Sequence, residues 1–140
     1  MAKAAYIAFA DDDSDDQEML VKRFLKYHPD TQFQLFKDGQ ELTHYLEACP
    51  DSDLPAVVLL DYKMPIVTGA DVLRILQAGK RYDAVRKVVW STSGNNQYVS
   101  ECMRNGAEKY FAKPNDVREL DEIITQIAAL FYAGEASRQS

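Results

Sequence analysis

The chain has 140 residues, of which 46% are hydrophobic and 27% are charged, proportions typical of a single globular domain. Acidic residues outnumber basic ones by 22 to 16, which gives a net charge of -6 and no basic cluster, so direct nucleic-acid binding is disfavoured. The longest apolar runs, 56–60 and 127–133, are too short to span a membrane.

Five short apolar segments alternate with five amphipathic ones. The apolar segments predict strands at residues 5–10, 32–36, 56–60, 87–91 and 109–112. The amphipathic segments predict helices at residues 14–28, 39–48, 69–78, 95–105 and 116–133. This alternation is typical of an α/β fold, in which a doubly wound parallel sheet has helices on both faces.

Several residues predict where the helices begin and end. Ser14 and Gln17 form a capping-box pattern ahead of a helix whose apolar positions include Met19. Asp116 and Glu119 repeat that pattern before the last helix. We expect the fourth helix to stop at Gly106 and the fifth before Gly134. We therefore expect the chain to consist of one domain at residues 1–134 and a short polar tail at residues 135–140.

Polar residues directly follow four of the predicted strands. Asp11, Asp12 and Asp13 follow the first, Asp61 the third, Ser91 lies at the end of the fourth, and Lys113 follows the fifth. In parallel sheets these ends share one rim, where ligands bind, so we expect the groups to converge there. The sequence leaves open which two members of the aspartate triplet point inward.

Converging carboxylates repel one another, and a bound cation or a raised pKa relieves that repulsion. Oxygen ligands suit Mg²⁺, and an aspartate beside such an ion can accept a phosphoryl group whose charge a lysine shares. Taken singly, each residue has an ordinary interpretation as a cap, turn or solvated loop residue. The joint pattern favours a phosphoryl-acceptor site.

These motifs resemble the receiver domains of two-component response regulators, of the single-domain type related to the chemotaxis regulator. The resemblance covers residues 5–133 and rests on the Asp11-Asp12 pair, D-Y-K-M-P-I-V-T-G at 61–69, Ser91, and Y-F-A-K-P at 110–114. Ser91 lies 30 residues after Asp61, and Lys113 lies 22 residues after Ser91. The resemblance implies a flavodoxin-like receiver topology with strand order 2-1-3-4-5, an order for which the chemotaxis protein is itself a standard example.

The resemblance also implies roles for individual residues. Asp61 is then the phosphoacceptor, Asp11 and Asp12 bind Mg²⁺ with Asp61, and the backbone carbonyl of Lys63 completes the ligands. Ser91 and Lys113 contact the phosphoryl oxygens. Ser91 and Tyr110 act as the switch, because added charge at Asp61 draws the neighbouring loops inward.

The implied function is that of a stand-alone, cytoplasmic signalling phosphoacceptor rather than an enzyme acting on a separate substrate. A sensor histidine kinase or histidine phosphotransfer protein would donate the phosphoryl group. A downstream target protein would bind the face formed by the fourth helix, fifth strand and fifth helix. The two widely separated cysteines, Cys49 and Cys102, are expected to be reduced, which agrees weakly with a cytoplasmic location.

Three alternative functions remain open at this stage. The fold could serve as an interaction module that phosphate does not switch. A flavin-binding protein of the same topology would need hydroxyl and glycine residues after the first strand, where Asp11, Asp12 and Asp13 stand. An aspartate-nucleophile phosphohydrolase would need an acid two residues after Asp61, where Lys63 stands.

Overall fold

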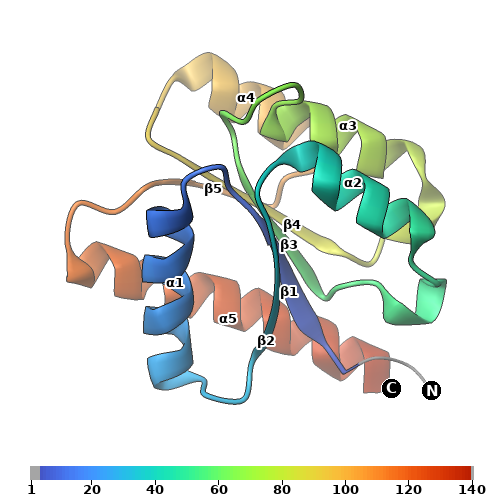
Figure 1. The fold of residues 1–140 in the computed structure, drawn as a ribbon, viewed down its shortest axis with the longest axis horizontal. Coiled ribbons are helices and arrows are strands. Elements are labelled where there is room, and N and C mark those ends of the chain that lie inside the picture. The colour runs from blue at the N-terminus through green and yellow to red at the C-terminus, as the bar shows by residue number, and fades with distance from the viewer. Residues whose placement is uncertain (1–3, 140) are drawn as a thin grey trace.

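Strands and helices alternate along the chain (Figure 1). The computed structural model describes the backbone of residues 4–139 and the side chains of residues 4–134. The strands are β1 (Tyr6–Ala10), β2 (Gln32–Phe36), β3 (Val57–Asp61), β4 (Arg86–Ser91) and β5 (Lys109–Ala112). The helices are α1 (Ser14–Tyr27), α2 (Gly39–Ala48), α3 (Gly69–Ala78), α4 (Asn96–Arg104) and α5 (Val117–Gln139).

All strand pairs in the sheet are parallel, in the order β2-β1-β3-β4-β5 that the resemblance implied. Every residue of β1 and β3 is buried, because these strands lie in the middle of the sheet and have helices over both faces. The uninterrupted apolar sequence of residues 56–60 is explained by this position.

Two hydrophobic clusters lie on opposite faces of the sheet. Ile7 and Phe9 of β1 pack with α1 and α5, whereas Ala8 and Ala10 of the same strand pack with α2, α3 and α4. Figure 1 shows the same division, with α1 and α5 together on one side of the strands. Because all strands run in the same direction, the strand ends that precede the helices lie along one rim of the sheet.

The predicted N-cap of α1 is wrong by one residue, although the helix begins at Ser14 as expected. Asp13, not Ser14, is the N-cap, and its side chain accepts hydrogen bonds from the amides of Asp15 and Asp16. Gln17 does not complete a capping box. It is buried and donates its side-chain amide to the carbonyls of Phe9 and Phe36, where β1 and β2 end. Met19, predicted to face the core, is 38% exposed.

The predicted stop at Gly106 and the predicted capping box at Asp116 are largely confirmed. The Asn95 side chain caps α4, and Gly106 follows that helix with φ of 99°, a conformation that favours glycine. The Asp116 carboxylate accepts the amide of Glu119, as predicted for α5. The Glu119 carboxylate instead accepts the amide of Asn115, one residue before the expected partner.

The predicted end of α5 is also wrong, because the helix continues through Gly134 to Gln139. Glycine ends a helix efficiently only where the chain turns into the left-handed region, and Gly134 does not have positive φ. A Cβ at Gly134 would meet Ala56 at 3.7 Å, so the glycine lies close against the start of β3. The backbone of residues 135–139, predicted as an irregular polar tail, is helical.

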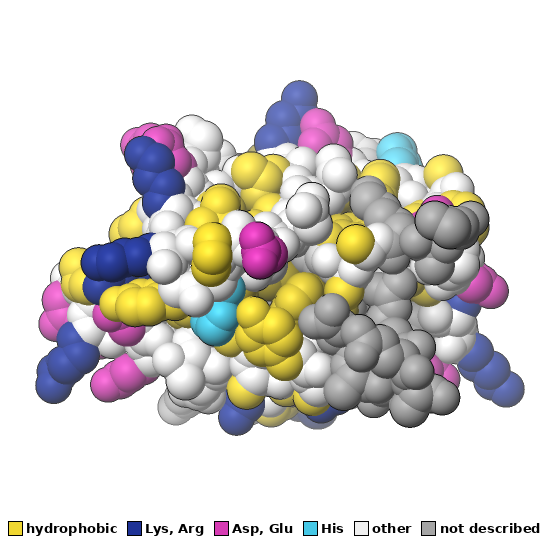
Figure 2. Space-filling model, turned by 90° about the horizontal axis from the view of Figure 1, so that it is seen from below, with side chains coloured by type: hydrophobic (Ala, Val, Ile, Leu, Met, Phe, Trp, Pro, Cys, Tyr) yellow, Lys and Arg dark blue, Asp and Glu magenta, His cyan; other side chains and the backbone are white. Residues whose placement is uncertain are grey.

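No helix in the described part of the chain is long and apolar enough to cross a membrane. Figure 2 views the molecule from below Figure 1. On this face the lysine and arginine side chains are scattered and lie among acidic, hydrophobic and neutral ones, so they form no continuous basic surface.

The connection from β3 to α3 contains a strained residue. Ile66 has φ of 72°, in the left-handed region that β-branched side chains disfavour, and it is 77% exposed. After it, Thr68 and Asp71 form a complete capping box that starts α3. Gly69 then packs so closely that a Cβ would lie 2.9 Å from the carbonyl oxygen of Asp61. The start of α3 therefore holds the backbone at the end of β3.

We expect Ile66→Asn to raise the free energy of unfolding by about 1 kcal/mol, because asparagine tolerates the left-handed conformation and little buried apolar surface is lost. Urea denaturation measures the change. Ile75→Asn is the matched control, since Ile75 is also partly exposed, at 40%, but lies within the regular helix α3. A gain in the control equal to that at Ile66 would contradict the assignment of strain.

Candidate functional site

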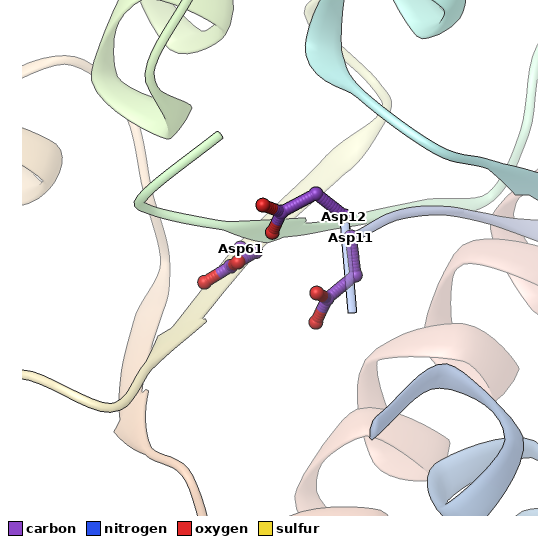
Figure 3. A group of neighbouring side chains, drawn as sticks. All are labelled: Asp11, Asp12 and Asp61. Atoms are coloured by element: carbon purple, nitrogen blue, oxygen red, sulfur yellow. The ribbon is translucent and has the colours of Figure 1, made fainter. Parts of the chain in front are cut away.

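Three carboxylates converge where β1 and β3 end (Figure 3). Asp11 and Asp12 follow β1, and Asp61 is the last residue of β3, which pairs directly with β1. One oxygen from each carboxylate lies within 4.8 Å of the others. Asp13 instead caps α1, so Asp11 and Asp12 are the two members of the triplet that face Asp61. The predicted convergence is confirmed for Asp11, Asp12 and Asp61.

The buried Asp11 carboxylate is held by hydrogen bonds to both oxygens. Its Oδ1 accepts the amide of Asp13 at 2.8 Å, and its Oδ2 accepts the indole N–H of Trp90 at 2.9 Å. Trp90 is fully buried and packs edge to face on Phe9. These donors fix the orientation of the carboxylate and satisfy both of its oxygens inside the protein.

The ammonium of Lys113 lies among three carboxylates. Its Nζ is 2.8 Å from Asp16, 3.1 Å from Asp11 and 3.7 Å from Asp61. Lys113 directly follows β5, and its backbone N–H donates to the carbonyl of Ser91 at 2.8 Å. The lysine therefore reaches the site from the far side of β4.

The pKa values reflect this crowding. Burial, followed by the charge of Asp11, raises the pKa of Asp61 to about 8, although the nearby Lys113 opposes the shift. Burial also raises the pKa of Asp11, against the hydrogen bond from Asp13 and the charge of Lys113. Burial would lower the pKa of Lys113, but the hydrogen bond to Asp16 and the charges of Asp11 and Asp61 outweigh it and raise that pKa.

Ser91 and Tyr110 are connected through a third residue, Ser93. Ser91 is fully buried at the end of β4, and its Oγ accepts the amide of Ser93 at 3.2 Å. The Tyr110 hydroxyl donates to the carbonyl of Ser93 at 2.8 Å. The structure therefore connects both predicted switch residues to one backbone segment, at Ser93.

A hollow of 450 Å³ opens above the carboxylates. Its lining includes the side chains of Asp12, Asp16, Asp61, Lys63, Thr92 and Lys113. The Lys63 Nζ lies 5.7 Å from the ring centroid of Tyr98, on α4. The assignment of the Lys63 backbone carbonyl as a metal ligand stays a prediction.

The donor set fits a small divalent cation. Asp11, Asp12 and Asp61 offer hard oxygen ligands close enough to share one ion, and the site contains neither histidine nor cysteine among its clustered groups. The raised pKa of Asp61 agrees with such a site. Burial and the repulsion between carboxylates disfavour the charged form of Asp61, and a bound cation would offset both.

Two residues of the site were not predicted. Asp16 lies in the first turn of α1, where acidic residues ordinarily complement a helix N-terminus, and the spacing from Asp13 gave no sign that it reaches Lys113. Trp90 is the residue before Ser91 in an apolar strand, and apolar residues there predict core packing. Only the three-dimensional contact with Asp11 identifies its indole N–H as part of the site.

In metal-free buffer, Asp61→Asn should increase the stability of the protein. The pKa of about 8 in the folded state exceeds the unfolded value near 3.9, so ionisation of Asp61 opposes folding. The free energy of unfolding should therefore decline as pH rises from about 4 to 8, and the variant should decline less steeply, with Asp11, whose pKa is also raised, still contributing. The gain at pH 7 should be on the order of 2 kcal/mol, measured by urea denaturation in EDTA.

Asp30→Asn serves as the control, because Asp30 is an exposed carboxylate outside the cluster. It should leave the pH dependence unchanged. An Asp61→Asn variant that retains the wild-type slope would show that Asp61 does not have the raised pKa.

Comparisons with known proteins agree with this geometry. A model of the response regulator receiver domain matches residues 7–125. The transcriptional regulatory protein DegU of Brevibacillus brevis is 31% identical over 117 residues, covering 81% of this chain and 48% of DegU. The probable methanogenesis regulatory protein FilR2 of Methanothrix harundinacea is 26% identical over 129 residues, covering 90% of this chain and 83% of FilR2.

The chain thus spans less than half of DegU, and its match to the two-component response regulator ORR2 of Oryza sativa covers 27% of that protein. Solved structures share the fold at low identity. The phosphorylated cyanobacterial phytochrome response regulator RcpA has a TM-score of 0.80 at 21% identity, covering 92% of this chain and 95% of that one. The Mn²⁺-bound response regulator Rcp1 has a TM-score of 0.77 at 22% identity, covering 90% and 93%.

The family match spans most of the chain, and the strand order and the acidic rim are those expected of the family. The chain therefore belongs to the receiver domains of two-component response regulators, a family that is phosphorylated on aspartate and interacts with histidine kinases and downstream effectors.

Proposed function

We propose that the chain is a stand-alone receiver that accepts a phosphoryl group on Asp61 in a Mg²⁺-dependent reaction. The observation that carries the proposal is the cluster of Asp11, Asp12 and Asp61, with oxygens within 4.8 Å, beside the ammonium of Lys113. A sensor histidine kinase or a histidine phosphotransfer protein is the donor. The match that covers 83% of FilR2 supports a protein consisting of little more than a receiver.

Asp11, Asp12 and Asp61 would hold Mg²⁺, with the Lys63 carbonyl as a further ligand. The bound ion supplies positive charge that offsets the charge gathered on the phosphoryl oxygens. The Mn²⁺-bound form of the relative Rcp1 supports a divalent cation in this fold.

The chain's own groups have separate tasks in the reaction. An Asp61 oxygen attacks phosphorus, the new P–O bond forms, and the bond from phosphorus to the donor histidine nitrogen breaks. The imidazole leaves with the electron pair and takes a proton from water. Lys113, already 3.7 Å from Asp61, pairs with the added negative charge. The protein promotes its own modification and acts on no other substrate.

Ser91 and Tyr110 would transmit the modification. The Ser91 hydroxyl can donate to a phosphoryl oxygen while its Oγ retains the bond from the Ser93 amide. A movement of Ser91 toward the phosphoryl group then displaces Ser93, whose carbonyl holds the Tyr110 hydroxyl. The surface of α4, β5 and α5 thereby changes, and we assign it to the downstream target protein.

The flavin-binding and phosphohydrolase alternatives have less support. Asp11 and Asp12 occupy the rim where a flavin phosphate would need backbone amides. A phosphohydrolase would need an acid two residues after Asp61, and that residue is the cation Lys63.

The reduced cysteines Cys49 and Cys102, both buried, agree with the cytoplasm as the compartment of this function.

Incubation of the protein with acetyl phosphate and Mg²⁺ should add one phosphoryl group to the intact mass. Asp61→Asn and EDTA should each abolish the addition, because one removes the acceptor and the other removes the cation. Asp30→Asn should be modified like the wild type. A wild-type mass that never increases would reject phosphorylation in favour of an unswitched interaction module.

Ser91→Ala should weaken binding of beryllofluoride, a phosphoryl mimic, roughly tenfold or more, because one charge-assisted hydrogen bond is lost. Titration in the presence of Mg²⁺ measures the affinity. Ser93→Ala is the matched control, since the Ser93 contacts to Ser91 and Tyr110 use backbone atoms and survive this change. Equal losses in both variants would contradict the role of Ser91.

A further inference from the structure

The closest carboxylate to the Lys113 ammonium belongs to Asp16 in α1, not to the phosphoacceptor. The Nζ–Oδ distances are 2.8 Å to Asp16 and 3.7 Å to Asp61. Only 10% of the Lys113 side chain and 28% of the Asp16 side chain are exposed, so water screens this pair less than a surface ion pair. Asp16 is therefore a strong partner for the lysine.

The ammonium has three N–H donors, and its two closest carboxylates occupy two of them. Asp16 at 2.8 Å and Asp11 at 3.1 Å lie within hydrogen-bond distance, whereas Asp61 at 3.7 Å does not. In the unmodified protein Lys113 is thus bonded to the start of α1 and the end of β1. Its contact with Asp61 is electrostatic only.

The backbone of Asp16 does not follow the lysine toward Asp61, because the first turn of α1 is held in place. Asp13 caps the turn by accepting the amides of Asp15 and Asp16. Gln17, the next residue, is buried and bonded to the carbonyls that end β1 and β2. A closer approach of Lys113 to Asp61 therefore lengthens the contact with Asp16.

We propose that Asp16 is a positioning residue that holds Lys113 back from Asp61 and competes with the phosphoryl group for the ammonium. This inference rests on the proposed phosphorylation of Asp61. Asp16 would lower the affinity of the site for the phosphoryl group. Phosphorylation adds negative charge at Asp61, so Lys113 moves toward it at the expense of Asp16. The anionic form of Asp16 also opposes that added charge directly.

Asp16→Asn should therefore bind beryllofluoride, in the presence of Mg²⁺, about tenfold more tightly than the wild type, because the competing charge-assisted bond is removed. Asp15→Asn is a matched control. It removes the same charge from the adjacent residue of the same helical turn, and Asp15 is exposed and forms no ion pair among the described residues. The control isolates the contact with Lys113 from the general effect of net charge.

A second measurement reports the lysine itself. Trp90 is the sole tryptophan of the chain, and the Lys113 Nζ lies 5.2 Å from its ring centroid. Release of Lys113 from Asp16 should change the tryptophan emission of unliganded Asp16→Asn, whereas Asp15→Asn should match the wild type. A loss of helix stability alone would not produce this difference at temperatures where all three proteins are folded.

The outcomes separate the two proposals. A wild-type protein that binds no beryllofluoride with Mg²⁺ overturns the proposed function itself. A wild-type protein that binds it, with Asp16→Asn equal to or weaker than Asp15→Asn, overturns the role of Asp16 and leaves phosphorylation intact. If Asp16→Asn does not fold, Asp16→Ser makes the same test, because serine also removes the carboxylate and is tolerated in the first turn of a helix.

Discussion

The ammonium group of Lys113 lies among more carboxylates than its single charge can neutralise, and the electrostatics of the site depend on this imbalance. Lys113 contacts Asp11, Asp16 and Asp61, while Asp12 lies beside them and forms no ion pair with a lysine in the described part of the chain. Burial makes each uncompensated charge costly, which is why the pKa of Asp61 rises to about 8. A ligand that brings positive charge would offset the same cost, which is why the donor set of the cluster fits a divalent cation.

The parallel sheet makes this arrangement possible. Residues far apart in the chain meet because β1, β3, β4 and β5 end at one rim, and each side chain needs only a strand end to reach the site. The close contact of Gly69 with the Asp61 carbonyl and the capping box of α3 then fix the backbone after β3. The strain at Ile66 is the conformational cost of that tight connection.

The predictable parts of the molecule follow from local patterns. Apolar runs and helix caps give the strands and most helix boundaries, and the residues after the strands give Asp11, Asp12, Asp61, Ser91 and Lys113. Asp16 and Trp90 were missed because their roles depend on contacts between elements, and a helix N-terminus or an apolar strand explains either residue locally. The end of α5 was misplaced because a glycine stops a helix only when its backbone turns, which sequence does not reveal.

Two sets of contacts lead away from the strand ends at the site. The first runs from Ser91 at the end of β4 through Ser93 to Tyr110 of β5. The second starts at Tyr62, the residue after Asp61, whose hydroxyl donates to Glu101 of α4 at 2.6 Å and whose ring stacks on Tyr98 at 4.2 Å.

Glu101 is itself held by Arg74 of α3 at 2.8 Å, so α4 is tied to α3 as well as to the strand end. A displacement of the backbone at Asp61 therefore reaches α4 directly through Tyr62, and one at Ser91 reaches Tyr110 through Ser93. Because these two sets of contacts share no residue, loss of the Tyr110 hydroxyl leaves the Tyr62 connection in place. The position of α4 is thus linked to the end of β3 through Tyr62 even when the contacts around Tyr110 change.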